Sequence, residues 1–151
     1  MLTADHASLS DHPFFANPVG YLTIPILIFK PDGSMAGEYN KAFSQTDILP
    51  STLNLLGYNK PFFAFGESYA SGKPGSTYSY ISGQHFLYGD SIACSFVSAK
   101  INSLYNYKRD SVLNVNLVKQ TPRVDSLYSE RFKAFIQTYN ATLLHNTGHL
   151  K

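Results

Sequence analysis

The sequence predicts an α/β fold whose C-terminal part is α+β, and two features of its 151 residues indicate this class. From residue 61 onward, short aromatic and β-prone runs alternate with turn residues, with too little chain between them for crossover helices. A long amphipathic pattern then follows near the C-terminal end. We therefore expect one compact unit, in which residues 1–60 form the end of an α/β core and residues 61–151 an antiparallel sheet covered by a terminal helix.

The first 60 residues are expected to contain the end of a sheet and one short helix. Residues 2–4 are typical of the end of a strand, and the apolar run 21–29 of a strand buried on both faces, with Pro25 at a bulge or an edge. The segment 47–56 places its apolar residues on one helical stripe. Asp47 is expected to be its N-cap, and Gly57 lies just past its end.

The remaining residues predict an antiparallel meander followed by a helix. The expected strands are 62–65, 77–81, 85–88, 92–97 and 104–107, with hairpin turns at 82–83 and 89–90 and an exposed loop near 68–77. The helix is expected near residues 125–144, because its apolar side chains share one face: Tyr128, Phe132, Phe135, Ile136, Tyr139 and Leu143.

Composition excludes several classes of protein. A net charge of +2, with 15% charged residues, is too small for binding to a nucleic-acid backbone. The single cysteine, Cys94, excludes an intramolecular disulfide framework, and its place in a β-prone run predicts a buried structural thiol. No run reaches the ~18 apolar residues of a membrane span, so we expect this chain to be soluble and to make no membrane contact.

One group of residues is a candidate for chemistry: Asp5 and His6, followed by His12. A carboxylate and an imidazole both offer a lone pair at neutral pH, which suits a divalent cation. Neighbouring residues on a regular strand point to opposite faces, so the pair converges only if the strand ends there and the backbone turns. The simpler interpretation, an exposed polar loop, stays open on these residues alone.

Four motifs in a fixed order give the pair a context. Thr3-Ala4-Asp5-His6 is followed by a motif from Ile24 to Pro31, by one from Ser44 to Gly57 and by one from Phe63 to Ser68. Together they resemble the C-terminal portion of a lipoteichoic-acid-synthase-like sulfatase or phosphoglycerol (phosphoethanolamine) transferase of the alkaline phosphatase superfamily. The resemblance continues more loosely through residues 78–86 and 105–110 to the final helix.

The resemblance implies a metal-dependent enzyme that acts on phosphate or sulfate esters through a covalent intermediate. It implies that Asp5 and His6 are metal ligands, for Mn²⁺, Mg²⁺, Ca²⁺ or Zn²⁺, and it offers His12 as a substrate-facing group, although a surface histidine explains His12 as well. The family's nucleophile lies upstream of the Asp-His pair, so we expect no catalytic residue in this chain, poor retention of the metal and no activity of the chain alone. The resemblance also implies an extracytoplasmic, membrane-anchored parent protein.

A second hypothesis is a stand-alone module whose aromatic meander binds a glycan or a protein without catalysis. An exposed apolar sheet edge near Met1 would favour the partial enzyme, because a truncated sheet has lost its neighbour, and a covered edge beside an aromatic cleft would favour the module. An exposed edge also predicts a homodimer formed by pairing of two copies.

Overall fold

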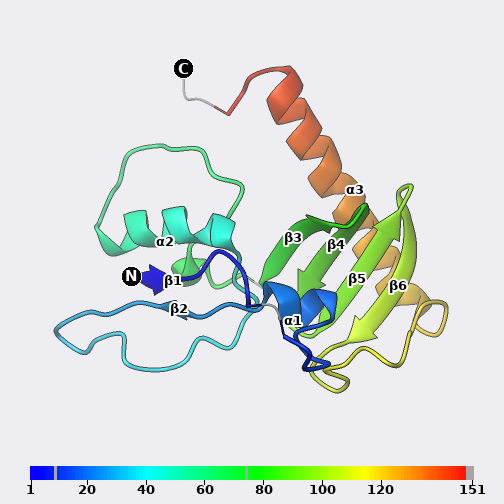
Figure 1. Cartoon of the computed structure of the whole chain (residues 1–151). Helices are drawn as coiled ribbons and strands as arrows, with labels where there is room; N and C mark the ends of the chain where they lie inside the picture. Colours follow the sequence, from blue (N-terminus) through cyan, green and yellow to red (C-terminus); the bar gives the residue numbers. More distant parts are fainter. Residues whose placement is uncertain (9, 74, 149–151) are drawn as a thin grey trace.

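The chain has an α+β fold in which a long helix covers one face of a four-stranded antiparallel sheet (Figure 1). The computed structural model describes residues 1–8, 10–73 and 75–148. The sheet follows chain order, and its elements are β3 (Ser76–Ile81), β4 (Gln84–Gly89), β5 (Ile92–Val97), β6 (Lys100–Asn106) and the covering helix α3 (Pro122–Leu144).

Two-residue loops make the outer hairpins of this sheet. Ser82 and Gly83 join β3 to β4 with φ of 49° and 82°, and Ser98 and Ala99 join β5 to β6 with φ of 48° and 59°. Two successive positive φ values are typical of the type I′ turn, whose twist matches that of the strands it joins. The first turn was expected from Ser-Gly, whereas Ser98-Ala99 carries no glycine signal.

The core lies on both faces of the sheet. On one face, Phe132 of α3 stacks on Phe96 with ring centroids 4.2 Å apart, within a cluster that also holds Leu87, Cys94, Leu104 and Tyr128. On the other face, a smaller cluster of Phe86, Tyr88 and Ala93 contacts Val19 and Leu22 of the short helix α1 (Pro18–Leu22). The predicted apolar face of the last helix is thus confirmed for Tyr128 and Phe132, which are buried.

The predicted strand over residues 21–29 is wrong. Asn17 caps α1 by accepting hydrogen bonds from the Val19 and Gly20 amides, and Pro18 occupies the first helical turn. These helix-start signals outweigh the apolar run that follows them. Within this run only Ile26–Leu27 forms a strand, β2, and it pairs antiparallel with β1 (Leu2–Thr3) over two residues of each strand.

Two further local expectations change. Residues 62–65 do not form a strand, although their aromatic rings contact one another and α3. The helix α2 (Ile48–Leu55) is preceded by a 3-10 turn, η1 (Gln45–Asp47), whose N-cap is Ser44. Asp47 occupies the N-cap position of α2, as expected, but its side chain makes no capping hydrogen bond to that helix. Its carboxylate instead accepts from the Ser44 amide and closes the capping box of η1.

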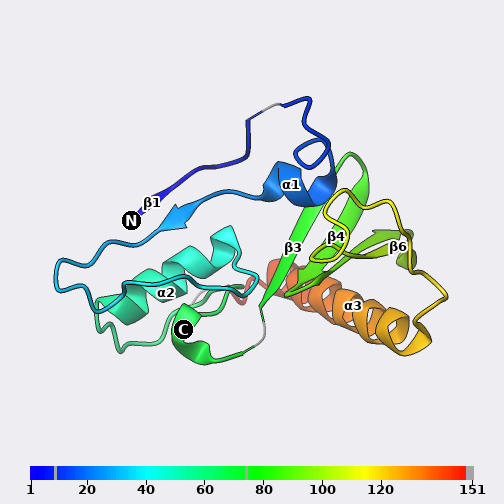
Figure 2. The ribbon, with the colours of Figure 1, turned by 90° about the horizontal axis from the view of Figure 1, so that it is seen from below.

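The N-terminal part leaves much apolar surface uncovered. The solvent-accessible surface of the chain is 10211 Å², against about 7,600 Å² for a compact protein of this mass. In both ribbon views β1, β2 and α2 lie to one side of the four-stranded sheet (Figures 1 and 2). Exposed large apolar side chains are concentrated in this part: Met1, Leu2, Phe15, Leu27, Phe29, Tyr39, Leu49, Leu56, Tyr58, Phe62, Phe63 and Phe65.

Two tyrosines next to α1 are expected to make the folded chain less stable at alkaline pH. Burial raises the pKa of Tyr88 to about 12, and burial together with the charge of Asp90 raises the pKa of Tyr107 to about 12. Tyrosine ionises near pH 10 in the unfolded chain, whereas these two tyrosines ionise only near pH 12 in the folded chain. Their contribution to the free energy of unfolding is therefore fully present below pH 10 and is lost as the pH rises to 12.

We expect Tyr88 alone to lower the free energy of unfolding by about 1.4 kcal/mol per pH unit between pH 10 and 12. Urea denaturation at several alkaline pH values measures this slope. Tyr88→Phe should make the slope shallower while leaving Tyr107 in place. An unchanged slope in that variant would show that Tyr88 does not carry the effect.

Candidate functional site

Asp5 and His6 lie where β1 ends and the backbone bends, and the structure brings their side chains together. Asp5 Oδ2 lies 3.6 Å from His6 Nε2, and the His6 amide donates to Asp5 Oδ1 at 2.9 Å. Both side chains are open to solvent, with exposed fractions of 87% for Asp5 and 59% for His6. The turn at the strand end thus allows adjacent residues to face a common point.

A backbone hydrogen bond determines which nitrogen of His6 is available. His6 Nδ1 lies 2.8 Å from the Ala7 carbonyl oxygen, and because a carbonyl only accepts, Nδ1 carries the hydrogen of the neutral ring. The lone pair is therefore on Nε2, the atom that faces Asp5. Metal-binding histidines are commonly oriented in this way by a backbone carbonyl on the other nitrogen.

Two side chains hold this turn. Gln45 Nε2 donates to the carbonyl oxygens of Ala4 and Asp5 at 3.3 and 2.8 Å, and the His6 ring stacks on Tyr21 with an interplanar angle of 9°. The role of Gln45 was not predictable from the sequence, because it depends on a contact across 40 residues of chain and a lone glutamine carries no local signal.

The pair offers a cation two donor atoms. With metal–ligand bonds of about 2.1 Å, two tetrahedral ligands lie about 3.4 Å apart, close to the observed 3.6 Å. The two donors therefore fit a divalent cation. Within residues 1–8, 10–73 and 75–148, no group of three His, Cys, Asp or Glu side chains is placed to share one ion.

His12 does not join the pair. Its Nδ1 accepts a hydrogen bond from the Phe14 amide at 3.2 Å, and its ring meets Phe15 edge-on. This placement in the loop before α1 leaves only Nε2 free of the backbone, and a substrate-facing role for His12 remains a prediction.

Cys94 is fully buried beneath α3, in agreement with the expected structural thiol. Burial raises the pKa of its thiol far above the usual range, and the nearby charge of Asp125 adds to this. A thiol that stays protonated and inaccessible cannot act as a nucleophile.

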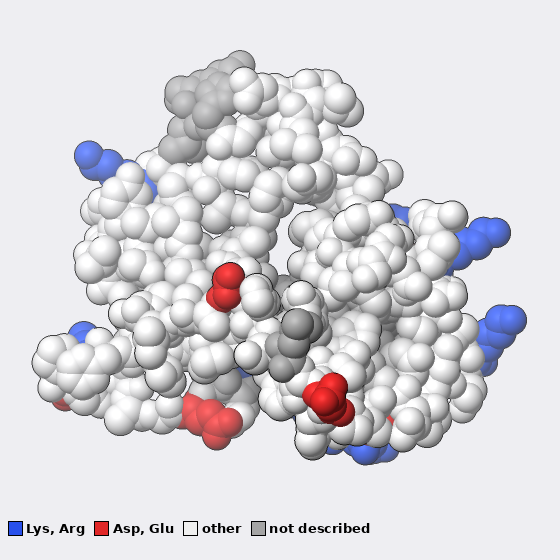
Figure 3. Space-filling view, viewed as in Figure 1, with Lys and Arg blue, Asp and Glu red and all other residues white. Residues whose placement is uncertain are grey.

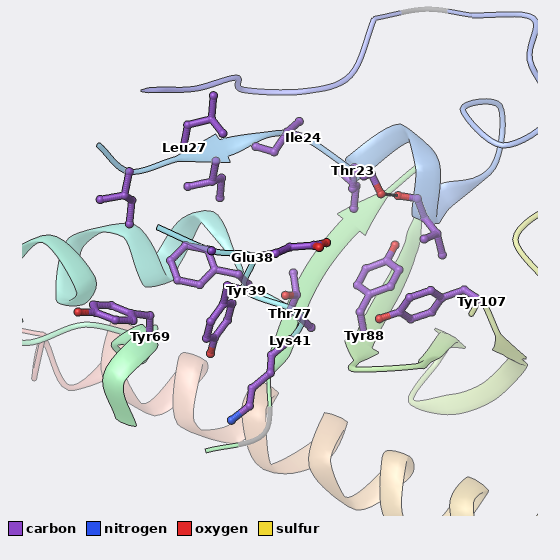
Figure 4. Close-up of a pocket in the computed structure, with 17 residues that line it drawn as sticks. Thr23, Ile24, Leu27, Glu38, Tyr39, Lys41, Tyr69, Thr77, Tyr88 and Tyr107 are labelled. Atoms are coloured by element: carbon purple, nitrogen blue, oxygen red, sulfur yellow. Dashed lines mark hydrogen bonds between the residues drawn. The ribbon is translucent and has the colours of Figure 1, made fainter. Parts of the chain in front are cut away.

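A cavity of about 500 Å³ lies between the segment around β2 and the four-stranded sheet. Figure 4 shows Ile24 and Leu27 on one wall and Tyr39 and Tyr69 on the opposite one, with Tyr88 and Tyr107 at the end near α1. The Lys41 ammonium turns away from it to donate to the carbonyls of Gly72 and Lys73. Aliphatic and tyrosine side chains therefore dominate this space.

A hollow separates α2 from the sheet in the space-filling view (Figure 3). A second cavity, of about 660 Å³, is lined by Phe65, Tyr78, Tyr139 and Arg131 among others. Lys and Arg side chains lie scattered around the rim of this face and form no continuous stripe on it.

Among the described residues, no helix combines the length and the apolar character that crossing a bilayer requires.

No family model matches this chain, and neither a curated protein nor a solved structure matches it.

Proposed function

We propose that this chain is part of a metal-dependent enzyme of the sulfatase and phosphotransferase type that acts on sulfate or phosphate esters, and that it contributes the ligands Asp5 and His6. One observation carries the proposal: Asp5 Oδ2 and His6 Nε2 face each other at 3.6 Å, while the Ala7 carbonyl oxygen lies 2.8 Å from His6 Nδ1 and leaves Nε2 as the donor atom of the neutral ring. An exposed polar loop does not require this orientation.

The uncovered apolar surface supports a role as part of a larger domain. Leu2 and Leu27, which pair across the β1–β2 ribbon, are 67% and 59% exposed, and Phe29 is 84% exposed. Apolar side chains beside an open strand edge are the feature that favours the partial enzyme over the stand-alone module. In this proposal a further part of a membrane-anchored, extracytoplasmic protein covers the ribbon.

The two ligands have distinct tasks in this proposal. Asp5 supplies a negative oxygen and His6 a neutral nitrogen, and the cation that they hold stabilises negative charge on the ester oxygens during transfer. Gln45 keeps both residues in place through the backbone. Because the other ligands and the nucleophile come from elsewhere, the chain alone is inactive and binds the cation weakly.

Mn²⁺ added to the labelled 151-residue chain should broaden amide resonances in NMR spectra most strongly around Asp5 and His6. Because the site has only two protein donors, we expect a dissociation constant for Mn²⁺ roughly in the millimolar range. Asp5→Asn and His6→Ala should each abolish the selective broadening. In an active parent enzyme, the same substitutions should lower activity by at least about 100-fold, since even outer-shell changes cost 10–100-fold in metal affinity.

Asp11→Asn and His12→Ala are the matched controls, because they change the same residue types a few positions away. Both should leave the broadening at Asp5 and His6 intact. Broadening centred on another part of the chain, or persisting in either Asp5→Asn or His6→Ala, would contradict the metal-ligand role.

A further inference from the structure

A third cavity, of about 520 Å³, lies on the face of the four-stranded sheet opposite α3. Side chains of three adjacent strands line it, and α1 and the segment around Asn116 close its sides. Its volume is within the range of ligand pockets, about 300–1,000 Å³. It is distinct from the Asp5–His6 pair, neither member of which lines it.

Two buried hydroxyl groups lie at the base of this cavity. Ser95 and Ser103, which are 1% and 8% exposed, face each other across β5 and β6 with their oxygens 2.6 Å apart. Only one of their two hydroxyl hydrogens can lie between these oxygens. Within the described residues the other hydrogen has no acceptor, so the pair retains a donor for a bound group.

A β-bulge brings an amide to the same place. Ser95 pairs with Ser103 but Phe96 pairs with Ile101, so Asn102 is an extra residue on β6. Its Nδ2 donates to Ser95 Oγ at 3.3 Å, which leaves its amide oxygen and its second hydrogen available. Bulges of this kind often redirect a side chain toward a functional site.

The rest of the lining has a mixed character. The Phe86 and Tyr105 side chains supply aromatic surface, and Gln84 supplies an amide that forms no hydrogen bond with the described residues. No Asp, Glu, Lys, Arg or His is among the described residues that line the cavity. Val19, Val112 and Leu113 add aliphatic surface, so the cavity offers neutral donors and acceptors beside aromatic and aliphatic side chains.

We propose that this cavity binds a neutral, hydroxyl-rich ligand, specifically a sugar. A sugar alternates hydroxyl groups with C–H surface. Its hydroxyl groups match the hydroxyl and amide groups at the base of the cavity, and its C–H surface matches the aromatic side chains. An anion would find no cation in the described lining. An apolar ligand would leave the second hydroxyl hydrogen of the Ser95–Ser103 pair and the amide oxygen of Asn102 unpaired, which is unfavourable. The proposal does not depend on metal binding.

The test is an NMR titration of the labelled 151-residue chain with glucose and, separately, with N-acetylglucosamine. At least one sugar should produce saturable shifts of amides at Ser95, Asn102 and Tyr105. Gln84→Ala should weaken binding about threefold to tenfold, the effect of one lost hydrogen bond, while the unfolding midpoint in urea stays unchanged.

Gln137→Ala is the matched control, because Gln137 is exposed on α3, on the other side of the sheet, and lines none of the three cavities. It should bind as the unmodified chain does. The proposal is overturned if neither sugar gives saturable shifts, if the shifts centre on exposed aromatic residues elsewhere, or if Gln84→Ala binds with unchanged affinity.

Discussion

Phe132→Ala is expected to lower the free energy of unfolding by about 3–5 kcal/mol. The Phe132 ring is 3% exposed and lies on Phe96 at 4.2 Å with an interplanar angle of 5°, and it also contacts the rings of Tyr78 and His85. Truncation removes this stacking and leaves a cavity between α3 and the sheet. Since domains of this size are stable by about 5–15 kcal/mol, the loss is a large share of the total.

Urea denaturation followed by circular dichroism measures this loss, and Phe29→Ala is the matched control. Phe29 is 84% exposed in this chain, so its truncation should change the free energy of unfolding by less than about 0.5 kcal/mol. A loss below about 1 kcal/mol for Phe132→Ala, or an equal loss for Phe29→Ala, would contradict the packing of α3 on the sheet.

Asp47→Ala is the second substitution with a large expected effect, a loss of about 2–5 kcal/mol. Asp47 is 7% exposed, and its two carboxylate oxygens accept from the backbone amides of Ser44 and Glu67 at 2.8 and 2.7 Å. Alanine would leave both amides without acceptors and would free the segment around Glu67 from the start of α2. Faster hydrogen exchange at the Glu67 amide should accompany the loss.

Asp32→Ala provides the comparison for Asp47→Ala. Asp32 also accepts from a backbone amide, that of Ser34 at 2.9 Å, but it lies in an exposed turn near Gly33. Its replacement should cost less than about 0.5 kcal/mol. If the two variants lose equal stability, burial of the Asp47 carboxylate does not determine its contribution.

Local patterns predicted the C-terminal half well. The expected strand 92–97 is β5, and 77–81 and 85–88 lie within β3 and β4, whereas 104–107 overlaps only the last part of β6 (Lys100–Asn106). The expected helix 125–144 is contained in α3, which begins three residues earlier at Pro122. These elements are predictable because alternation along a strand and a recurring apolar face on a helix are determined by residues close in the chain.

The N-terminal half was predicted less well, for two different reasons. Residues 21–29 have the apolar character of a buried strand, but Asn17 and Pro18 start a helix just before them, and Leu22 covers the sheet. At α2 the expected N-cap position, Asp47, is correct, but the preceding turn η1 and its cap Ser44 were not expected, since Ser44, Thr46 and Asp47 all offer oxygen acceptors near the helix start. Which of them caps the turn depends on backbone geometry that composition does not specify.

The sequence by itself determined the α+β class, the meander, the last helix and the adjacency of Asp5 and His6. Only the tertiary structure decided that His6 presents Nε2 to Asp5, that Gln45 supports their backbone, and that Asn102 reaches Ser95 beside Ser103. Hydrophobic periodicity reports which face of an element is buried, but it does not report which other segment covers that face. Such contacts join residues distant in the chain, and they form only when the packing of the whole chain brings these residues together.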